Sequence, residues 1–156
     1  MNILLVFDSK FGNTEKIARA MGTALSKTNE VKIVRASEAL NTDFTNYELL
    51  IVGSPTNGGW ASPLAKAFLD NIPVGALNGK KAAAFDTGST PDGEGFIGKT
   101  AIKLFGYAAP RTAKILESKG AKVLANENFF VKGMEGPIIE GELERAQEWA
   151  LQLCQN

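Results

Sequence analysis

The chain has 156 residues, of which 44% are hydrophobic and 22% are charged, and its 17 basic and 17 acidic residues leave no net charge at pH 7. This length and composition are typical of a single globular domain over residues 1–156 and exclude a disordered chain. The balanced charge excludes a field that would recruit nucleic acid or an anionic membrane, and no apolar run is long enough to span a bilayer.

Short apolar strands and amphipathic helices alternate along the chain. In chain order we expect a strand at 3–7, a helix from Asn13, a strand at 31–34, a helical turn at 37–40 capped by Ser37, a strand at 49–52, a helix from Ser62-Pro63, a strand at 82–85, a helix from Pro110 to Gly120, a strand from Val123, and a last helix from about Gly141. The last helix should bury a stripe formed by Leu143, Ala146, Ala150 and Leu153. Because right-handed crossovers leave few other arrangements, this alternation predicts an α/β fold, a three-layer doubly wound sandwich around a five-stranded parallel sheet.

The turn between the first strand and the first helix is the most distinctive segment. It brings hydroxyl side chains, a glycine and backbone N–H groups to the positive end of a helix, where an anion such as a phosphate is stabilised. Its residues are Ser9, Lys10, Phe11, Gly12, Asn13 and Thr14. The glycine-rich signatures of nucleoside triphosphatases and dinucleotide-binding proteins are absent from it, which argues against ATP, GTP and NAD. Taken alone, the turn is equally consistent with an ordinary capped helix start.

Two further loops follow the third and fourth expected strands, at the edge where ligands bind in folds of this class. The second loop has glycines that permit unusual backbone conformations and a tryptophan that offers a stacking face; its residues are Pro55, Thr56, Asn57, Gly58, Gly59 and Trp60. The third loop runs from Asp86, Thr87 and Gly88 to Phe96, and its consecutive N–H groups suit the polar edge of a heterocycle. The alternatives are a tight loop with Trp60 as a surface anchor, and a mobile surface loop.

The chain contains no histidine and a single cysteine, Cys154. Without histidine, the Ser/His/Asp and Cys/His types of nucleophilic site are excluded, and the commonest transition-metal ligand is missing. We therefore expect no catalytic residue and no metal site, and any chemistry has to come from a bound cofactor. A single cysteine cannot form an internal disulfide, and no signal segment is recognisable, so we expect a cytoplasmic protein.

Together, the three loops resemble those of the flavodoxin-like family of FMN-binding proteins, and the resemblance extends over nearly the whole chain. Ser9, Gly12, Asn13 and Thr14 match the family's phosphate-binding loop, in which Phe11 replaces a threonine. The resemblance implies the sheet order 2-1-3-4-5, FMN as the cofactor, and the three loops as its binding residues. It also implies that the peptide of Asn57 and Gly58 turns to bond N5 of the one-electron-reduced flavin.

Two aromatic positions depart from the family pattern. Flavodoxins with a stacking tryptophan carry it near the position of Asn57, so stacking by Trp60 is a hypothesis of its own. The tyrosine that usually follows the third loop is absent, and Phe96, or secondarily Tyr107, would replace it. The apolar segment 96–107 is expected to cover the flavin, to form a dimer contact, or to pack as an extra helical turn.

The resemblance implies a flavoprotein of electron transport that carries electrons between a reductase and an acceptor protein, as a monomer or homodimer. The alternative is an oxidoreductase of the same fold, an FMN-dependent NAD(P)H:quinone or related flavin reductase. A receiver-type signalling domain is rejected because Gly53 and Ser54 stand where it needs an aspartate. Flavodoxin-type carriers are usually strongly acidic. This chain is balanced, so partner steering should be weak unless Asp86, Asp92 and Glu94 gather beside the flavin.

Overall fold

The structure is a computed structural model that describes residues 1–90 and 96–155, with only the backbone described at residues 96–98 and 101. Within these residues, five strands form one sheet: β1 (Asn2–Phe7), β2 (Glu30–Arg35), β3 (Leu49–Pro55), β4 (Lys81–Ser89) and β5 (Lys122–Val131). Every neighbouring pair is parallel and the order is β2-β1-β3-β4-β5. The expected fold class and strand order are therefore confirmed.

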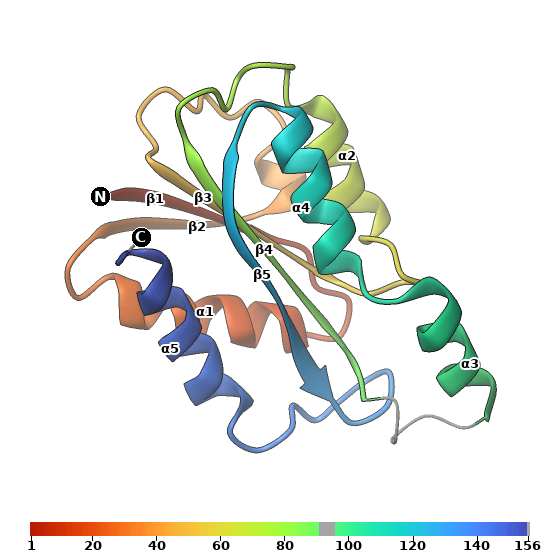
Figure 1. Ribbon diagram of the computed structural model, residues 1–156. Coiled ribbons are helices and arrows are strands. Elements are labelled where there is room, and N and C mark those ends of the chain that lie inside the picture. The colour runs from red at the N-terminus through yellow and green to blue at the C-terminus, as the bar shows by residue number, and fades with distance from the viewer. Residues whose placement is uncertain (91–95, 156) are drawn as a thin grey trace.

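The helices lie on both faces of this sheet (Figure 1). They are α1 (Asn13–Leu25), a 3-10 turn η1 (Ala36–Glu38), α2 (Pro63–Asn71), α3 (Phe96–Phe105), α4 (Ala108–Ser118) and α5 (Glu142–Leu153). Helices α1 and α5 cover one face, α2 and α4 cover the other, and α3 stands apart near the carboxyl ends of the strands (Figure 1). Among the described residues, no helix combines the length and apolar character needed to cross a bilayer.

The strands are apolar on both sides because both faces of the sheet are covered. Successive residues of β1 alternate between two hydrophobic clusters: Leu4 and Val6 pack toward α2 and α4, while Ile3 and Leu5 pack toward α1 and α5. Within the sheet, Gly53 of β3 lies beside Phe85 of β4, and a Cβ on Gly53 would lie 2.0 Å from the Phe85 ring. This two-sided core fixes the carboxyl ends of the strands as one rigid edge, from which the loops project.

Helix boundaries differ from the sequence expectation in two places. The turn after β2 begins directly at Ala36 with Arg35 at its N-cap, so Ser37 lies inside the turn and does not cap it. Helix α4 starts at Ala108, so Pro110 occupies its third position, where the missing N–H leaves no helical bond unmade.

The buried stripe of α5 also differs from the expectation. Leu143 is exposed, whereas Glu142 and Trp149 are buried with the predicted alanines and Leu153. The expectation was wrong at this end because Glu142 accepts a hydrogen bond from the Phe130 N–H at 2.7 Å and is paired with Arg145. A carboxylate with these partners can occupy a buried position that hydrophobicity alone assigns to leucine.

Candidate functional site

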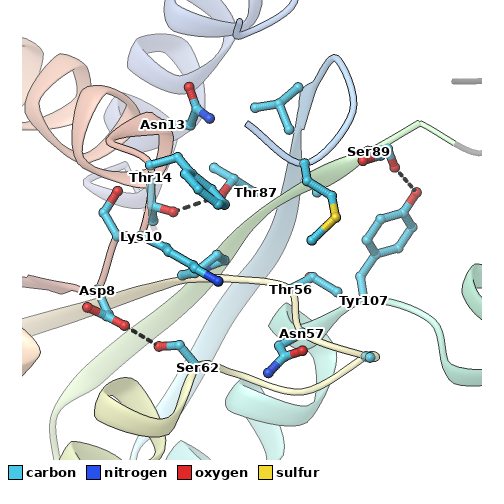
Figure 2. A pocket seen from close by; sticks show the side chains of 18 of the residues that line it. Asp8, Lys10, Asn13, Thr14, Thr56, Asn57, Ser62, Thr87, Ser89 and Tyr107 are labelled. Carbon is cyan, nitrogen blue, oxygen red and sulfur yellow. Dashed lines mark hydrogen bonds between the residues drawn. The ribbon is translucent and has the colours of Figure 1, made fainter. Parts of the chain in front are cut away.

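A cavity of about 790 Å³ opens at the carboxyl ends of the strands. It is lined by Asp8, Ser9, Lys10, Phe11, Asn13, Thr14, Pro55, Thr56, Asn57, Gly58, Gly59, Ser62, Pro63, Leu64, Thr87, Gly88, Ser89, Ile102, Gly106, Tyr107, Val131, Gly133 and Met134. All three predicted loops therefore contribute to one cavity, and Figure 2 shows their polar side chains around it. Its volume lies within the range of about 300–1,000 Å³ that is usual for small-molecule and cofactor sites.

The first loop leaves polar groups without partners. Gly12 is the N-cap of α1 with φ 88°, and no side chain of the described residues caps the helix. The Oγ of Ser9 is buried and has no hydrogen-bond partner among the described residues. An unpaired buried hydroxyl beside uncapped N–H groups at a helix start favours an anion site over an ordinary capped helix.

The hydroxyl of Thr14 joins the first loop to the third. Its Oγ1 lies 2.7 Å from Oγ1 of Thr87, and both side chains are buried (Figure 2). Its neighbour Asn13 donates a hydrogen bond to the Glu135 carbonyl at 2.9 Å, which ties α1 to the loop after β5. A Cβ on Gly136 would lie 2.8 Å from the Asn13 side chain, so this contact requires glycine. The start of α1 is thus fixed from two directions.

Asp8 and Lys10 are the charged residues among those that line the cavity. The carboxylate of Asp8 accepts a hydrogen bond from the Ser62 hydroxyl at 2.5 Å, which joins the end of β1 to the start of α2 (Figure 2). Lys10 is exposed, and its Nζ lies 5.2 Å from the centre of the Phe11 ring, itself exposed at the rim. Asp8 and Ser62 were not among the residues expected at the site; the polar side chain of Asp8 directly after the first apolar strand was the available signal for it.

The second loop forms a tight two-residue hairpin. Asn57 and Trp60 exchange backbone hydrogen bonds of 2.8 and 3.0 Å, and the residues between them, Gly58 and Gly59, have φ 55° and 81°. Positive φ at both positions is what a type I′ turn requires. A Cβ on Gly58 would meet nothing within 4 Å, whereas one on Gly59 would lie 2.4 Å from the Phe105 carbonyl oxygen. Gly59 is fixed against α3, and the peptide of Asn57 and Gly58 has open space beside it.

Trp60 does not line the cavity. The guanidinium of Arg111 lies over its ring, 4.6 Å from the centre, and Arg111 also donates hydrogen bonds to the carbonyls of Gly59 and Phe105. The ring is therefore covered by Arg111 and otherwise exposed to solvent. This geometry fits the surface-anchor alternative for Trp60, and stacking of its ring on a ligand stays a prediction.

In the third loop, Thr87 and Gly88 line the cavity, and their contact with a cofactor stays a prediction. Ser89 donates a hydrogen bond to the Gly133 carbonyl at 2.8 Å, and Tyr107 donates one to the Ser89 carbonyl at 3.1 Å (Figure 2). The Tyr107 ring packs so closely on β4 that a Cβ on Gly88 would lie 3.2 Å from it.

Tyr107, the secondary candidate for the aromatic position after the third loop, thus lines the cavity. Phe96 begins α3, and its side chain lies outside the described residues, so its predicted contact stays a prediction.

Asp86 was predicted as a site residue, but it is not among the residues that line the cavity. Along β4, alternate side chains face opposite sides, so Thr87 faces α1 and the cavity while Asp86 faces α4. Its carboxylate accepts hydrogen bonds from the Ala109 N–H at 2.7 Å and the Asn128 amide at 2.9 Å, and burial raises the pKa of this carboxyl to about 6. Asp86 therefore supports the cavity from below, and the proposed acidic cluster with Asp92 and Glu94 falls partly outside the described residues.

Comparison with known proteins supplies a family context. The chain matches the family model described as flavodoxin over residues 5–149. A flavodoxin of Aquifex aeolicus is 36% identical over 90 residues, which are 54% of this chain and 49% of that protein. An NAD(P)H dehydrogenase (quinone) of Cupriavidus metallidurans is 30% identical over 116 residues, 58% of each chain. The alignments with the curated flavodoxins span about half the length of those proteins.

A similar fold is also found among solved structures. The crystal structure of oxidised flavodoxin 1 from Bacillus cereus superposes with a TM-score of 0.78 and covers 100% of this chain and 99% of its own. The two sequences are 21% identical, so this likeness concerns the fold alone.

Proposed function

This chain belongs to the flavodoxin family, whose members bind FMN and transfer electrons to redox partner proteins, and we propose that FMN occupies the cavity and that the protein carries electrons between a reductase and an acceptor. The bound flavin supplies the redox chemistry. The residues of the chain bind it, orient it and shield it from water.

The observation that carries this proposal is the buried, unpartnered Oγ of Ser9. It lies in the same loop as Gly12, whose conformation leaves the first N–H groups of α1 without a side-chain cap. A phosphate at this place would accept hydrogen bonds from both. Each charge-assisted bond of this kind contributes about 1.5–3 kcal/mol. Because the loop offers several such donors, it can hold the phosphate without the threonine that Phe11 replaces.

The remainder of the cavity suits a flat heterocycle. The second loop over residues 55–59 lines it together with Thr87, Gly88 and Tyr107. Phe11, Leu64 and Met134 line the rim and are exposed. An apolar ring system covering these side chains would remove them from water, which adds to the binding free energy.

The test is a set of binding and reduction measurements on the purified protein. FMN should bind more tightly than riboflavin, and inorganic phosphate added at constant ionic strength should weaken FMN binding. A protein that takes up no FMN, or that binds both ligands equally, would contradict the proposal.

Reduction assays separate the carrier from the alternative enzyme. Under anaerobic conditions, NAD(P)H alone should not reduce the bound flavin, whereas an added reductase should. Rapid reduction by NAD(P)H alone would assign the chain to the FMN-dependent NAD(P)H:quinone or flavin reductases instead. The proposal also includes a cytoplasmic location. It further includes a monomeric or homodimeric state, and gel filtration of the FMN-loaded protein measures this oligomeric state.

A further inference from the structure

Helix α3 and the second loop form an exposed surface beside the mouth of the cavity. We call it the α3 face; it consists of Trp60, Lys99, Lys103, Leu104, Phe105 and Arg111. Leu104 is 69% exposed, Phe105 is 51% exposed and Trp60 is 53% exposed. Figure 1 shows α3 standing away from the layered body of the domain. These apolar side chains therefore face solvent rather than a core.

Arg111 joins the two parts of the α3 face. Its guanidinium lies over the Trp60 ring and donates hydrogen bonds to the Gly59 and Phe105 carbonyls. Ile102, from the same helix, lines the cavity. The α3 face is thus continuous with the proposed flavin site through both α3 and the hairpin, and a protein bound there would lie next to the redox centre.

The α3 face is basic, although the chain as a whole is neutral. Residues 96–116 contain three lysines and one arginine and no acidic residue. Lys99 and Lys103 are exposed, and the ion pairs found among the described residues involve neither of them. By contrast, residues 133–148 contain five glutamates and one arginine. Asp92 and Glu94, which precede α3, lie outside the described residues. Although the net charge is zero, basic residues are therefore concentrated in residues 96–116 and acidic residues in residues 133–148.

We propose that the α3 face docks a redox partner protein whose contact surface is acidic around an apolar centre. This inference rests on the proposed function as an electron carrier. Trp and Arg are residue types that dominate binding energy in interfaces, and a ring of opposite charge speeds encounter and selects the partner. Carriers of this family are usually acidic and would therefore bind a basic partner. The basic α3 face would instead bind a partner whose contact surface is acidic.

A second copy of this chain fits the α3 face less well. A symmetric contact would place Lys99 and Lys103 of one copy against the same lysines of the other, and like charges in contact are unfavourable. A contact with the glutamate-rich region of another copy would be head-to-tail and would not close into a dimer. Charge complementarity thus selects a different protein as the occupant.

The test uses the FMN-loaded protein, labelled with 15N, and two probes of opposite charge. One probe is an acidic [2Fe–2S] ferredoxin and the other is basic cytochrome c. At low ionic strength, the ferredoxin should shift the amide signals of the α3 face and of the hairpin, and raising the salt to about 0.15 M should weaken this binding. Cytochrome c should leave the α3 face unshifted.

Matched charge reversals separate local from global charge. Lys99→Glu with Lys103→Glu should weaken ferredoxin binding about tenfold or more. Lys27→Glu with Lys122→Glu changes the net charge equally. These exposed lysines precede β2 and begin β5, so they lie at the amino ends of the strands, whereas the cavity lies at the carboxyl ends. This control should weaken binding by less than about twofold. Leu104→Ser should weaken binding several-fold without changing its salt dependence.

The proposal would be overturned by equal loss in both lysine pairs, by ferredoxin shifts that map away from α3, by tighter binding of cytochrome c at the α3 face, or by shifts there that depend only on the concentration of this chain. FMN content is read from absorbance before each titration. A colourless protein would refute the proposed function, whereas a yellow protein with no shifts on the α3 face would refute only the docking surface.

Discussion

Replacing Ser9 by alanine should change the stability of the free protein and its affinity for FMN in opposite directions. The Oγ of Ser9 is buried without a hydrogen-bond partner among the described residues. An unsatisfied buried polar group costs about 1–3 kcal/mol. Ser9→Ala removes that cost, so the free energy of unfolding of the FMN-free protein should rise by about 1 kcal/mol, and its Tm by about 2–4 °C.

The same substitution removes one donor from the proposed phosphate site. Losing one charge-assisted hydrogen bond costs about 1.5–3 kcal/mol, so the Kd for FMN should rise about ten- to a hundredfold. Riboflavin lacks the phosphate, and its Kd should change by less than about twofold. Urea unfolding of the FMN-free protein and fluorescence titrations with the two ligands measure these quantities.

Ser118→Ala is the matched control. Ser118 is exposed on α4, and its hydroxyl donates a hydrogen bond to the Ile115 carbonyl at 2.6 Å. This variant should change stability by less than about 0.5 kcal/mol and should bind both ligands normally. If Ser9→Ala lowers the stability of the FMN-free protein, the hydroxyl has a partner there. If FMN and riboflavin weaken equally, the first loop is not the phosphate site.

Two further predictions concern residues that support the cavity. Burial raises the pKa of Asp86 from 3.8 to about 6, so its contribution to stability is complete below pH 3.8 and is lost as the pH rises through about 6. In urea unfolding, the free energy of unfolding of Asp86→Asn should rise by up to about 3 kcal/mol relative to that of the parent chain between pH 4 and pH 7. A difference between the two proteins that stays constant with pH would contradict this. Arg111→Lys keeps the charge but loses the guanidinium fork that reaches the Gly59 and Phe105 carbonyls. The Trp60 amide should then exchange about tenfold faster with solvent, and unchanged exchange would show that Arg111 does not hold the hairpin.

The sequence was sufficient for the features that depend on local patterns. The apolar runs predicted all five strands, because each of these signals lies within a few neighbouring residues. The anion site expected from the hydroxyls and glycine of the first loop stays a prediction. The helix start at Asn13 was also predicted correctly. The strand order came from the family resemblance, since alternation alone does not determine which strands are neighbours.

Features that depend on long-range packing were not predictable. The orientation of Trp60 depends on Arg111, which lies 51 positions later in the chain. The burial of Asp86 depends on the start of α4 and on β5, which only the folded chain brings beside it. Tyr107 reaches the third loop because α3 returns the chain to the cavity, and no short-range pattern reports that return.

The hydroxyl pair of Thr14 and Thr87 has a consequence for how the two halves of a ligand influence each other. Each hydroxyl has a single proton to donate, and the two oxygens lie 2.7 Å apart. If Thr14 gives its proton to a phosphate, the proton between the pair must come from Thr87. Thr87 then has no hydrogen left to offer to the heterocycle and presents only an acceptor. Occupancy at one end of the cavity thereby sets the polarity at the other, so a dephosphorylated flavin would encounter a ring pocket with a different hydrogen-bonding character.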